Sequence, residues 1–177
     1  MTLAGGGNTA QALKAIAAGV IPLKPEAGIS RRTFFYYFHS KEAILMEFMR
    51  GGFVKALRPT LLEQSTDQTP LAAVRNCLLQ LMSFQETEEV IVIDRLLGST
   101  EALQARKQAA FVEGEQSAFE ALCELWLEPG RRASLRIVAM VSIGALRLAK
   151  EAWRQEGGKQ PLTKYLRESF AALEMEI

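Results

Sequence analysis

The segment from residue 28 to residue 45 constrains the fold more than any other part of the chain. Gly28 allows the positive φ angle of a tight turn, and Ser30 is a good helix N-cap. Two arginines and then five consecutive aromatic residues follow the serine. Phe34 and Phe38 are four residues apart and therefore share one face of a helix. This arrangement predicts a short helix with an apolar inner face and a basic, aromatic outer face suited to phosphates and base edges.

The remainder of the sequence has the periodicity of helices. Apolar residues recur at intervals of three and four residues. The pattern is interrupted, as at helix ends, by Gly98, Pro129-Gly130 and Gly157-Gly158. We expect a further helix to close at Arg58-Pro59, because proline removes a backbone hydrogen bond. No run reads as a strand, since residues 90–93 are too few and lie within a helical pattern. The expected fold is all-α, with helices over residues 9–19, 30–38, 41–57, 69–84, 90–97, 100–127, 131–155 and 161–177.

The order of residues in the aromatic segment is similar to that in a known family. The segment resembles the recognition helix and the next helix of tetracycline-repressor-type (TetR) regulators. The residues that carry the resemblance are Gly28-Ile29-Ser30, Thr33, the aromatic run 34–38 and Ser40-Lys41-Glu42-Ala43-Ile44-Leu45. The resemblance implies a helix-turn-helix DNA-binding domain over residues 1–50 and a helical ligand-binding and dimerisation domain over residues 51–177. Pro25 departs from the family pattern, so the first two helices of the head are expected to be atypical.

The resemblance also implies which residues contact DNA. The recognition helix would enter the major groove of a palindromic operator, with its N-terminal part toward the bases. Arginine suits guanine edges and phosphates, and a lysine at a helix N-terminus suits phosphate. Charge supports this placement, because residues 24–41 carry four basic residues and one acid while the whole chain has a net charge of +1. The predicted DNA-binding residues are Arg31, Arg32, Thr33, Phe35, Tyr36, Tyr37 and Lys41.

Two stripes near the C-terminus are candidates for a dimer interface. The first consists of small residues, which let helices approach closely, and the second of apolar residues at near-heptad spacing. The resemblance implies that both stripes form a four-helix interface between two subunits, whereas an ordinary intrachain core remains the alternative. The stripes are Ala139, Ser142, Ala145 and Ala149, followed by Leu162, Leu166, Phe170 and Leu173.

The resemblance implies a pocket for a small apolar effector among the central helices. Such residues are often plain core, so their grouping in a pocket rests on the family. An effector would act by favouring a dimer whose two heads are wrongly spaced for the operator. The predicted lining is Leu81, Met82, Phe84, Leu96, Phe111, Phe119, Trp126, Met140 and Trp153.

The sequence has few residues for chemistry. His39 is the single histidine, and phosphate loops, Cys-X-X-Cys pairs and His-Glu-X-X-His motifs are missing from the sequence. Cys77 and Cys123 fit apolar helical patterns as free thiols, and the apolar run 137–146 is too short for a bilayer. We therefore expect a cytoplasmic binding protein without enzymatic activity, cofactor, metal or membrane contact. The prediction is a DNA-binding repressor released by an apolar effector; the alternative is a dimeric helical module that binds a small molecule or protein but not DNA.

Overall fold

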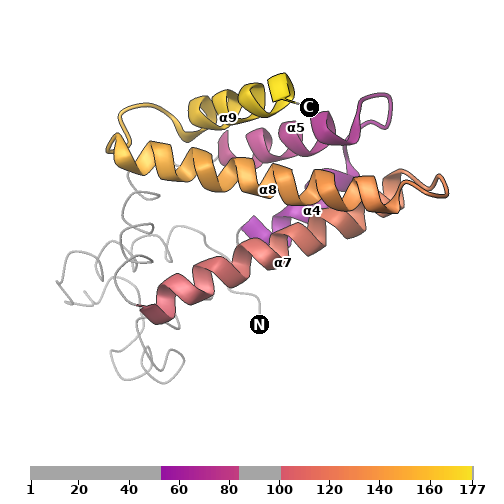
Figure 1. Ribbon diagram of the computed structural model, residues 1–177, viewed down its shortest axis with the longest axis horizontal. Coiled ribbons are helices and arrows are strands. Elements are labelled where there is room, and N and C mark those ends of the chain that lie inside the picture. Colours follow the sequence, from indigo (N-terminus) through magenta and orange to yellow (C-terminus); the bar gives the residue numbers. More distant parts are fainter. Residues whose placement is uncertain (1–52, 84–100, 177) are drawn as a thin grey trace, which may run out of the picture.

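The computed structural model describes residues 53–83 and 101–176, which form five helices and contain no strand. These helices are α4 (Lys55–Leu62), α5 (Pro70–Ser83), α7 (Glu101–Leu125), α8 (Arg132–Gln155) and α9 (Leu162–Glu176) (Figure 1). The all-α prediction is confirmed for this part of the chain, and α5, α7, α8 and α9 begin and end within two residues of the predicted limits. The helices predicted at residues 9–19, 30–38 and 90–97 lie outside the described residues.

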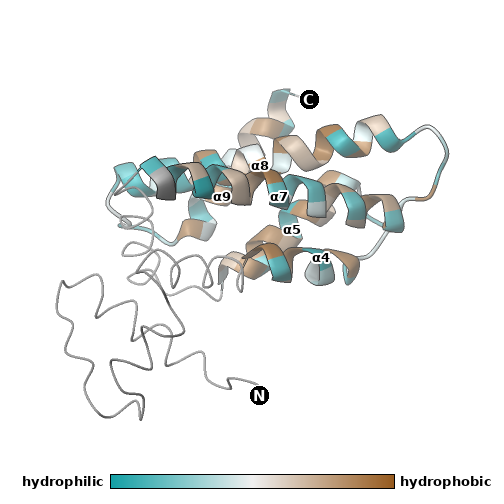
Figure 2. Cartoon of the chain, turned by 90° about the horizontal axis from the view of Figure 1, so that it is seen from below, coloured by the Kyte–Doolittle hydropathy of each residue, from teal (hydrophilic) through white to brown (hydrophobic). Residues whose placement is uncertain are grey.

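Helix α8 is the centre of the assembly. It packs against α9, α7 and α5, while α4 packs against α7 and α5, and α9 also packs against α5 (Figure 1). Each helix carries hydrophobic and hydrophilic residues on different sides, so that hydrophobic sides can face neighbouring helices (Figure 2). The C-terminal ends of α5 and α8 and the N-terminal end of α7 lie at the same end of the bundle (Figure 1).

The core draws large side chains from every described helix. Burying one such side chain contributes about 1.5–3 kcal/mol relative to leaving it in water. Helix α8 alone contributes eight buried residues, in agreement with its packing against α9, α7 and α5. The largest fully buried side chains are Trp153, Phe170, Leu57, Leu61, Leu78, Leu122, Leu135, Ile143, Leu146 and Leu166.

Helix α4 corrects the prediction of a helix end at Arg58-Pro59. The helix continues through Pro59 to Leu62, and Leu57 and Leu61 on either side of the proline are fully buried. Proline cannot donate a backbone hydrogen bond, so the carbonyl of Lys55 lacks the amide partner it would otherwise have. Because Lys55 is exposed, water can reach that carbonyl, and burial of the two leucines outweighs the missing bond.

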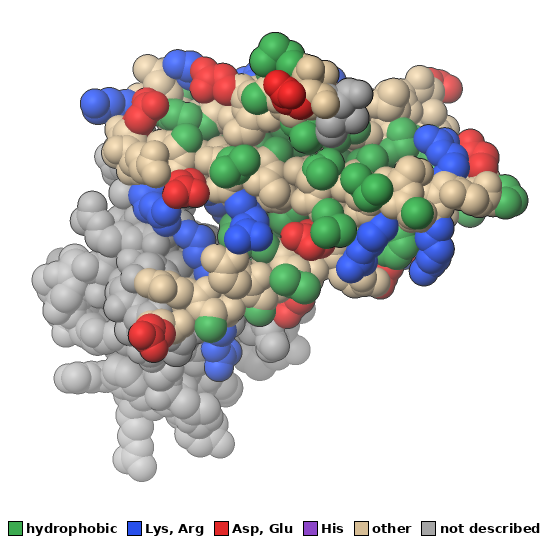
Figure 3. Space-filling model, in the orientation of Figure 1, with side chains coloured by type: hydrophobic (Ala, Val, Ile, Leu, Met, Phe, Trp, Pro, Cys, Tyr) green, Lys and Arg blue, Asp and Glu red, His purple; other side chains and the backbone are tan. Residues whose placement is uncertain are grey.

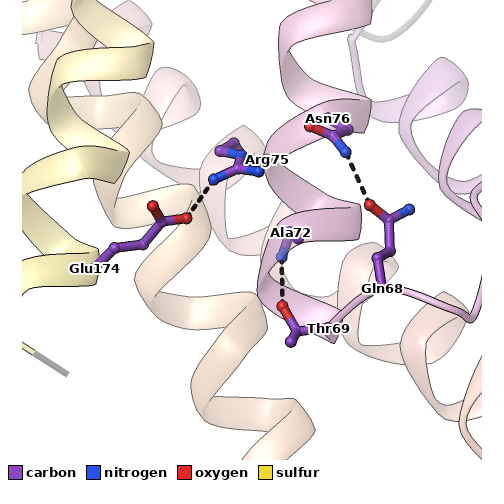
Figure 4. A network of polar contacts seen from close by, with 6 residues as sticks. All are labelled: Gln68, Thr69, Ala72, Arg75, Asn76 and Glu174. Atoms are coloured by element: carbon purple, nitrogen blue, oxygen red, sulfur yellow. Dashed lines mark hydrogen bonds and ion pairs between the residues drawn. The ribbon is translucent and has the colours of Figure 1, made fainter.

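Helix α5 begins at a well-formed cap. The Thr69 hydroxyl oxygen accepts a hydrogen bond of 3.2 Å from the Ala72 amide, and Pro70 occupies the first helical position, where no donor is needed (Figure 4). Farther along α5, Arg75 donates to Glu174 of α9 at 2.5 Å, in the same network of contacts (Figure 4). Both side chains are partly exposed, so this ion pair contributes no more than about 1 kcal/mol.

The turns after α7 and α8 depend on glycine. Gly130, Gly157 and Gly158 have φ angles of 89°, 69° and 70°, in the left-handed region that other residues rarely adopt. Gly158 donates to the Trp153 carbonyl at 2.9 Å and thereby ends α8. The sequence breaks at Gly130 and Gly157-Gly158 are therefore confirmed as helix ends. Among the described helices, none is both long and apolar enough to cross a bilayer.

Candidate functional site

The predicted DNA-binding residues lie outside the part of the chain that the structure describes. They remain a prediction from the sequence: Arg31, Arg32, Thr33, Phe35, Tyr36, Tyr37 and Lys41. Phe84 and Leu96, two of the predicted pocket residues, also lie outside the described ranges.

Of the other predicted pocket residues, one faces solvent. Met140 has 49% of its surface exposed and shares the outer face of α8 with Ile137 and Leu148. It lies apart from the buried candidates, because α5, α7 and α9 pack against other sides of this helix. Leu81 is half-buried, whereas Met82, Phe111, Phe119, Trp126 and Trp153 are between 2% and 7% exposed.

The buried pocket candidates divide between the two ends of the bundle. The charged groups of Arg147 and Lys150 lie 5.5 and 5.9 Å from the centre of the Phe111 ring, which places that ring beside the C-terminal part of α8. Phe119 lies instead beside the first turns of α8, and Trp126 directly follows α7. From Arg132 to Trp153, α8 rises about 32 Å. These side chains therefore cannot all line one pocket for a small molecule.

Three of the buried candidates belong to the half of the bundle where α5 and α8 end and α7 begins (Figure 1). Met82 is in the last turn of α5, Trp153 is in the last turn of α8, and Phe111 is in the N-terminal half of α7. Among the described residues, the indole Nε1 of Trp153 is buried and has no hydrogen-bond partner. A buried donor without a partner costs about 1–3 kcal/mol, which an acceptor on a bound molecule would recover. We call Met82, Phe111 and Trp153 the Trp153 cluster.

A second orphaned polar atom lies midway along α8. The Oγ of Ser142 is fully buried and has no partner within the described residues. Because Ser142 is eleven residues from Trp153, the two atoms lie about 16 Å apart along the helix. Ser142 therefore belongs to the wall between α8 and its neighbours and not to the Trp153 cluster.

The residues predicted for the dimer interface pack inside one subunit. Five of these residues have no exposed surface: Ala139, Ser142, Ala149, Leu166 and Phe170. The others are Ala145 and Leu162, with 5% and 7% of their surface exposed, and Leu173, which is partly buried. Small residues on α8 let α9 approach closely, which is the intrachain alternative that the stripe left open. This burial shows how the residues pack within one chain and does not test the prediction that they form a subunit interface.

A different apolar stripe on α8 is uncovered. Ile137, Met140 and Leu148 are 59%, 49% and 63% exposed, and a side chain at Gly144 would meet nothing within 4 Å. These four residues, which we call the outer face, recur at three- and four-residue spacing, and Figure 3 shows hydrophobic side chains gathered along α8. The same three- and four-residue spacing is visible in the sequence, beside the more regular run of small residues.

Two ionisable groups in the described residues are perturbed by burial. Burial, together with the nearby Glu63 carboxylate, raises the pKa of the Cys77 thiol from 9.0 to about 12. Its Sγ–H donates weakly to the Leu57 carbonyl at 3.7 Å. Burial also raises the pKa of Tyr165, whose hydroxyl donates to Glu156 Oε2 at 2.8 Å. A thiol that stays neutral is a poor nucleophile and metal ligand, so Cys77 has a structural role.

The fold and these surfaces define an all-helical regulatory domain: a core built around α8, a cluster of apolar side chains with an unsatisfied donor at one end, and an uncovered apolar face. The family model of the MftR C-terminal domain, a TetR-family C-terminal domain, matches residues 68–177. The chain therefore belongs to the TetR family of transcriptional regulators. No curated protein matches the chain.

Proposed function

We propose that the chain is a DNA-binding repressor, with a helix-turn-helix head over residues 1–50 and an effector-binding, dimerising body over residues 51–177. The observation that carries the proposal is the family match over residues 68–177, in a chain whose residues 28–45 form a basic and aromatic segment of the kind that reads DNA. We propose a binding role without catalysis, exercised in the cytoplasm.

The DNA contact is tested by selecting fragments that the purified protein retains. A palindromic consensus is expected, and replacing Arg31 and Arg32 by Ala should weaken binding and flatten its dependence on salt, because fewer counterions are released. Replacing Lys159 and Lys164 by Ala removes the same charge from the far part of the chain and serves as the control. If no DNA is retained while the chain still dimerises, the dimeric binding module without DNA contact becomes the function.

We propose that two chains associate through the outer face of α8. Isolated apolar side chains are common on surfaces, but a continuous stripe around an open glycine is the pattern of a close helix contact. Replacing Ile137 and Leu148 by Asp should convert a dimer into a monomer in sedimentation velocity. The control is Leu127→Asp, because Leu127 is 80% exposed and lies beyond α7. A dimer that survives the first replacement contradicts this interface.

We propose that the effector is an apolar molecule bearing one hydrogen-bond acceptor, bound at the Trp153 cluster. The unsatisfied Nε1 of Trp153 supports this, since a ligand carbonyl or carboxylate would satisfy it inside an otherwise apolar site. Binding beside Trp153 would favour one arrangement of the helices around it and so one spacing of the two heads, which must be about 34–36 Å to read adjacent grooves.

The effector site has a built-in optical probe. The chain has two tryptophans, so a Trp126→Phe variant emits from Trp153 alone. A panel of aromatic carbonyl compounds should alter this emission and raise the melting temperature, whereas hydrocarbons of the same shape should do so less. Trp153→Phe should abolish the preference for the carbonyl. If the two series bind equally well to the wild-type chain, the indole donor has no part in recognition.

A further inference from the structure

The Phe111 ring, which belongs to the Trp153 cluster, has a positive charge beside it. The guanidinium carbon of Arg147 on α8 lies 5.5 Å from the centre of this ring on α7. The Arg147 side chain is exposed, whereas Phe111 has 7% of its surface exposed. In Figure 3 Lys and Arg side chains lie along this border of α7 with α8. The proposed effector site therefore has a cation where it approaches solvent.

This cation has no counterion within the described residues. Arg147 forms no ion pair there. Glu115 on α7 and Glu151 on α8 are one turn away from the ring and from Arg147, and neither is paired with it. Lys150, 5.9 Å from the same ring, takes part in a further interaction. A ring contact leaves the N–H donors of a guanidinium available to oxygen acceptors, so Arg147 can bind an anion.

Two donors of different kinds thus belong to the same part of the bundle. The Nε1–H of Trp153 is buried, neutral and without a partner, while the guanidinium of Arg147 is charged and exposed. An uncharged acceptor such as a carbonyl suits the buried donor, because burying a charged group costs far more than burying a neutral one. A carboxylate suits Arg147, since its planar pair of oxygens matches the edge of a guanidinium and its single charge balances one cation.

The separation of the two donors limits the size of the ligand. Arg147 and Trp153 are six residues apart, so their backbones are separated by about 9 Å along α8. A molecule that satisfies both donors has its uncharged acceptor and its carboxylate at opposite ends of an apolar body. Two linked aromatic rings have a suitable length.

The Phe119 ring provides a comparison within the same chain. The guanidinium carbon of Arg132 lies 4.9 Å from the centre of that ring, and Arg132 also forms no ion pair within the described part of the chain. From Arg132 to Arg147, however, α8 rises about 22 Å. Arg132 therefore makes the same kind of ring contact as Arg147 but lies far from the Trp153 indole.

We propose that the effector is an acid: an apolar molecule whose uncharged acceptor binds the Nε1–H of Trp153 and whose carboxylate binds Arg147. This inference rests on the proposed effector site at the Trp153 cluster, and it names the chemical class of molecule that the site takes. Arg147 determines the preference for an anion, while the indole donor and the apolar side chains bind the rest of the molecule.

A keto acid and its uncharged amide test this preference. The acid is a biphenyl with an acetyl group at one end and a carboxylate at the other, and the amide is the matching carboxamide, which has the same shape. The emission of Trp153 in the Trp126→Phe chain measures the binding of each compound. The acid should bind at least ~5-fold more tightly, because hydrogen bonds between ionised groups are stronger than those between neutral groups. This preference should decrease as salt is raised, since Arg147 is exposed.

Variants of Arg147 identify the group that binds the carboxylate. Arg147→Gln should lower the affinity for the acid to that for the carboxamide and leave the affinity for the carboxamide unchanged. Arg147→Lys retains the charge and should retain most of the preference. The control is Arg132→Gln, which removes the same charge from the Phe119 ring and should leave the preference intact. Circular dichroism verifies that each variant is helical.

The outcomes separate this inference from the proposed effector site. If the acid and the carboxamide bind equally well, or if Arg147→Gln reduces the preference no more than Arg132→Gln does, Arg147 does not bind the effector and only the apolar site stands. If the acid, the carboxamide and the panel of aromatic carbonyl compounds all leave the emission of Trp153 and the melting temperature unchanged, the effector site and this inference both fail.

Discussion

Replacing Pro59 by Ala is expected to stabilise the protein. Pro59 lies inside α4, is exposed, and lies between the buried residues Leu57 and Leu61. Alanine restores a backbone donor for the carbonyl of Lys55, and no packing is lost because the proline ring faces solvent.

The expected size follows from two opposing contributions. Proline is about 3 kcal/mol less favourable than alanine in a helix interior. The unfolded chain is freer without the proline, which offsets about 0.4–1 kcal/mol of that difference. A net gain of about 2 kcal/mol remains. At about 2–4 °C per kcal/mol for a chain of this size, the melting temperature should rise by about 4–8 °C.

Thermal unfolding followed by circular dichroism, at one fixed protein concentration, measures the change. The control is Pro161→Ala, because Pro161 is exposed but directly precedes α9, where a helix needs no donor. The control should leave the melting temperature unchanged or lower it slightly. A Pro59→Ala protein that melts at or below the wild-type temperature refutes the idea that the proline weakens α4.

Three other predictions follow from burial and backbone geometry. Leu166→Ala should lower the free energy of unfolding by about 2–5 kcal/mol, while Leu127→Ala should change it by less than about 0.5 kcal/mol in urea titrations. Burial raises the pKa of the Cys77 thiol from 9.0 to about 12. The neutral thiol therefore contributes its full stability below pH 9, and this contribution is lost as the pH rises toward 12. The free energy of unfolding of Cys77→Ala should fall less than that of the wild type over the same pH interval. Gly157→Ala, at a φ angle of 69°, should destabilise by about 1 kcal/mol in the same titrations.

The helices of the body could be predicted from the sequence because their signals are local. Periodic apolar residues and the breaks at Gly130 and Gly157 place α7, α8 and α9 within two residues of their observed ends. The end of α4 could not be predicted in this way. The rule that proline ends a helix is also local, but in α4 burial of Leu57 and Leu61 against α5 and α7 decides the outcome.

The burial of the candidate site residues is harder to predict from the sequence, because which side of a helix is covered depends on distant segments. The small residues of α8 and the exposed residues Ile137 and Leu148 both recur at helical spacing, and only the position of α9 distinguishes them. Trp153 was among the predicted pocket residues, but its unsatisfied Nε1 depends on every neighbour around the ring. The contacts of Arg132 and Arg136 with the Phe119 ring were missed because cations and rings on separate helices show no fixed spacing in sequence.

The position of α9 has a consequence for synthesis of the protein in the cell. Leu166 and Phe170 of α9 are fully buried, and they cover α8 and α5, which are made earlier. Until α9 has left the ribosome, the side chains it covers are open to water and to other nascent chains. The body therefore completes its core only after α9 has been made, and a chain truncated before Leu162 is a product that chaperones and proteases should treat as unfolded.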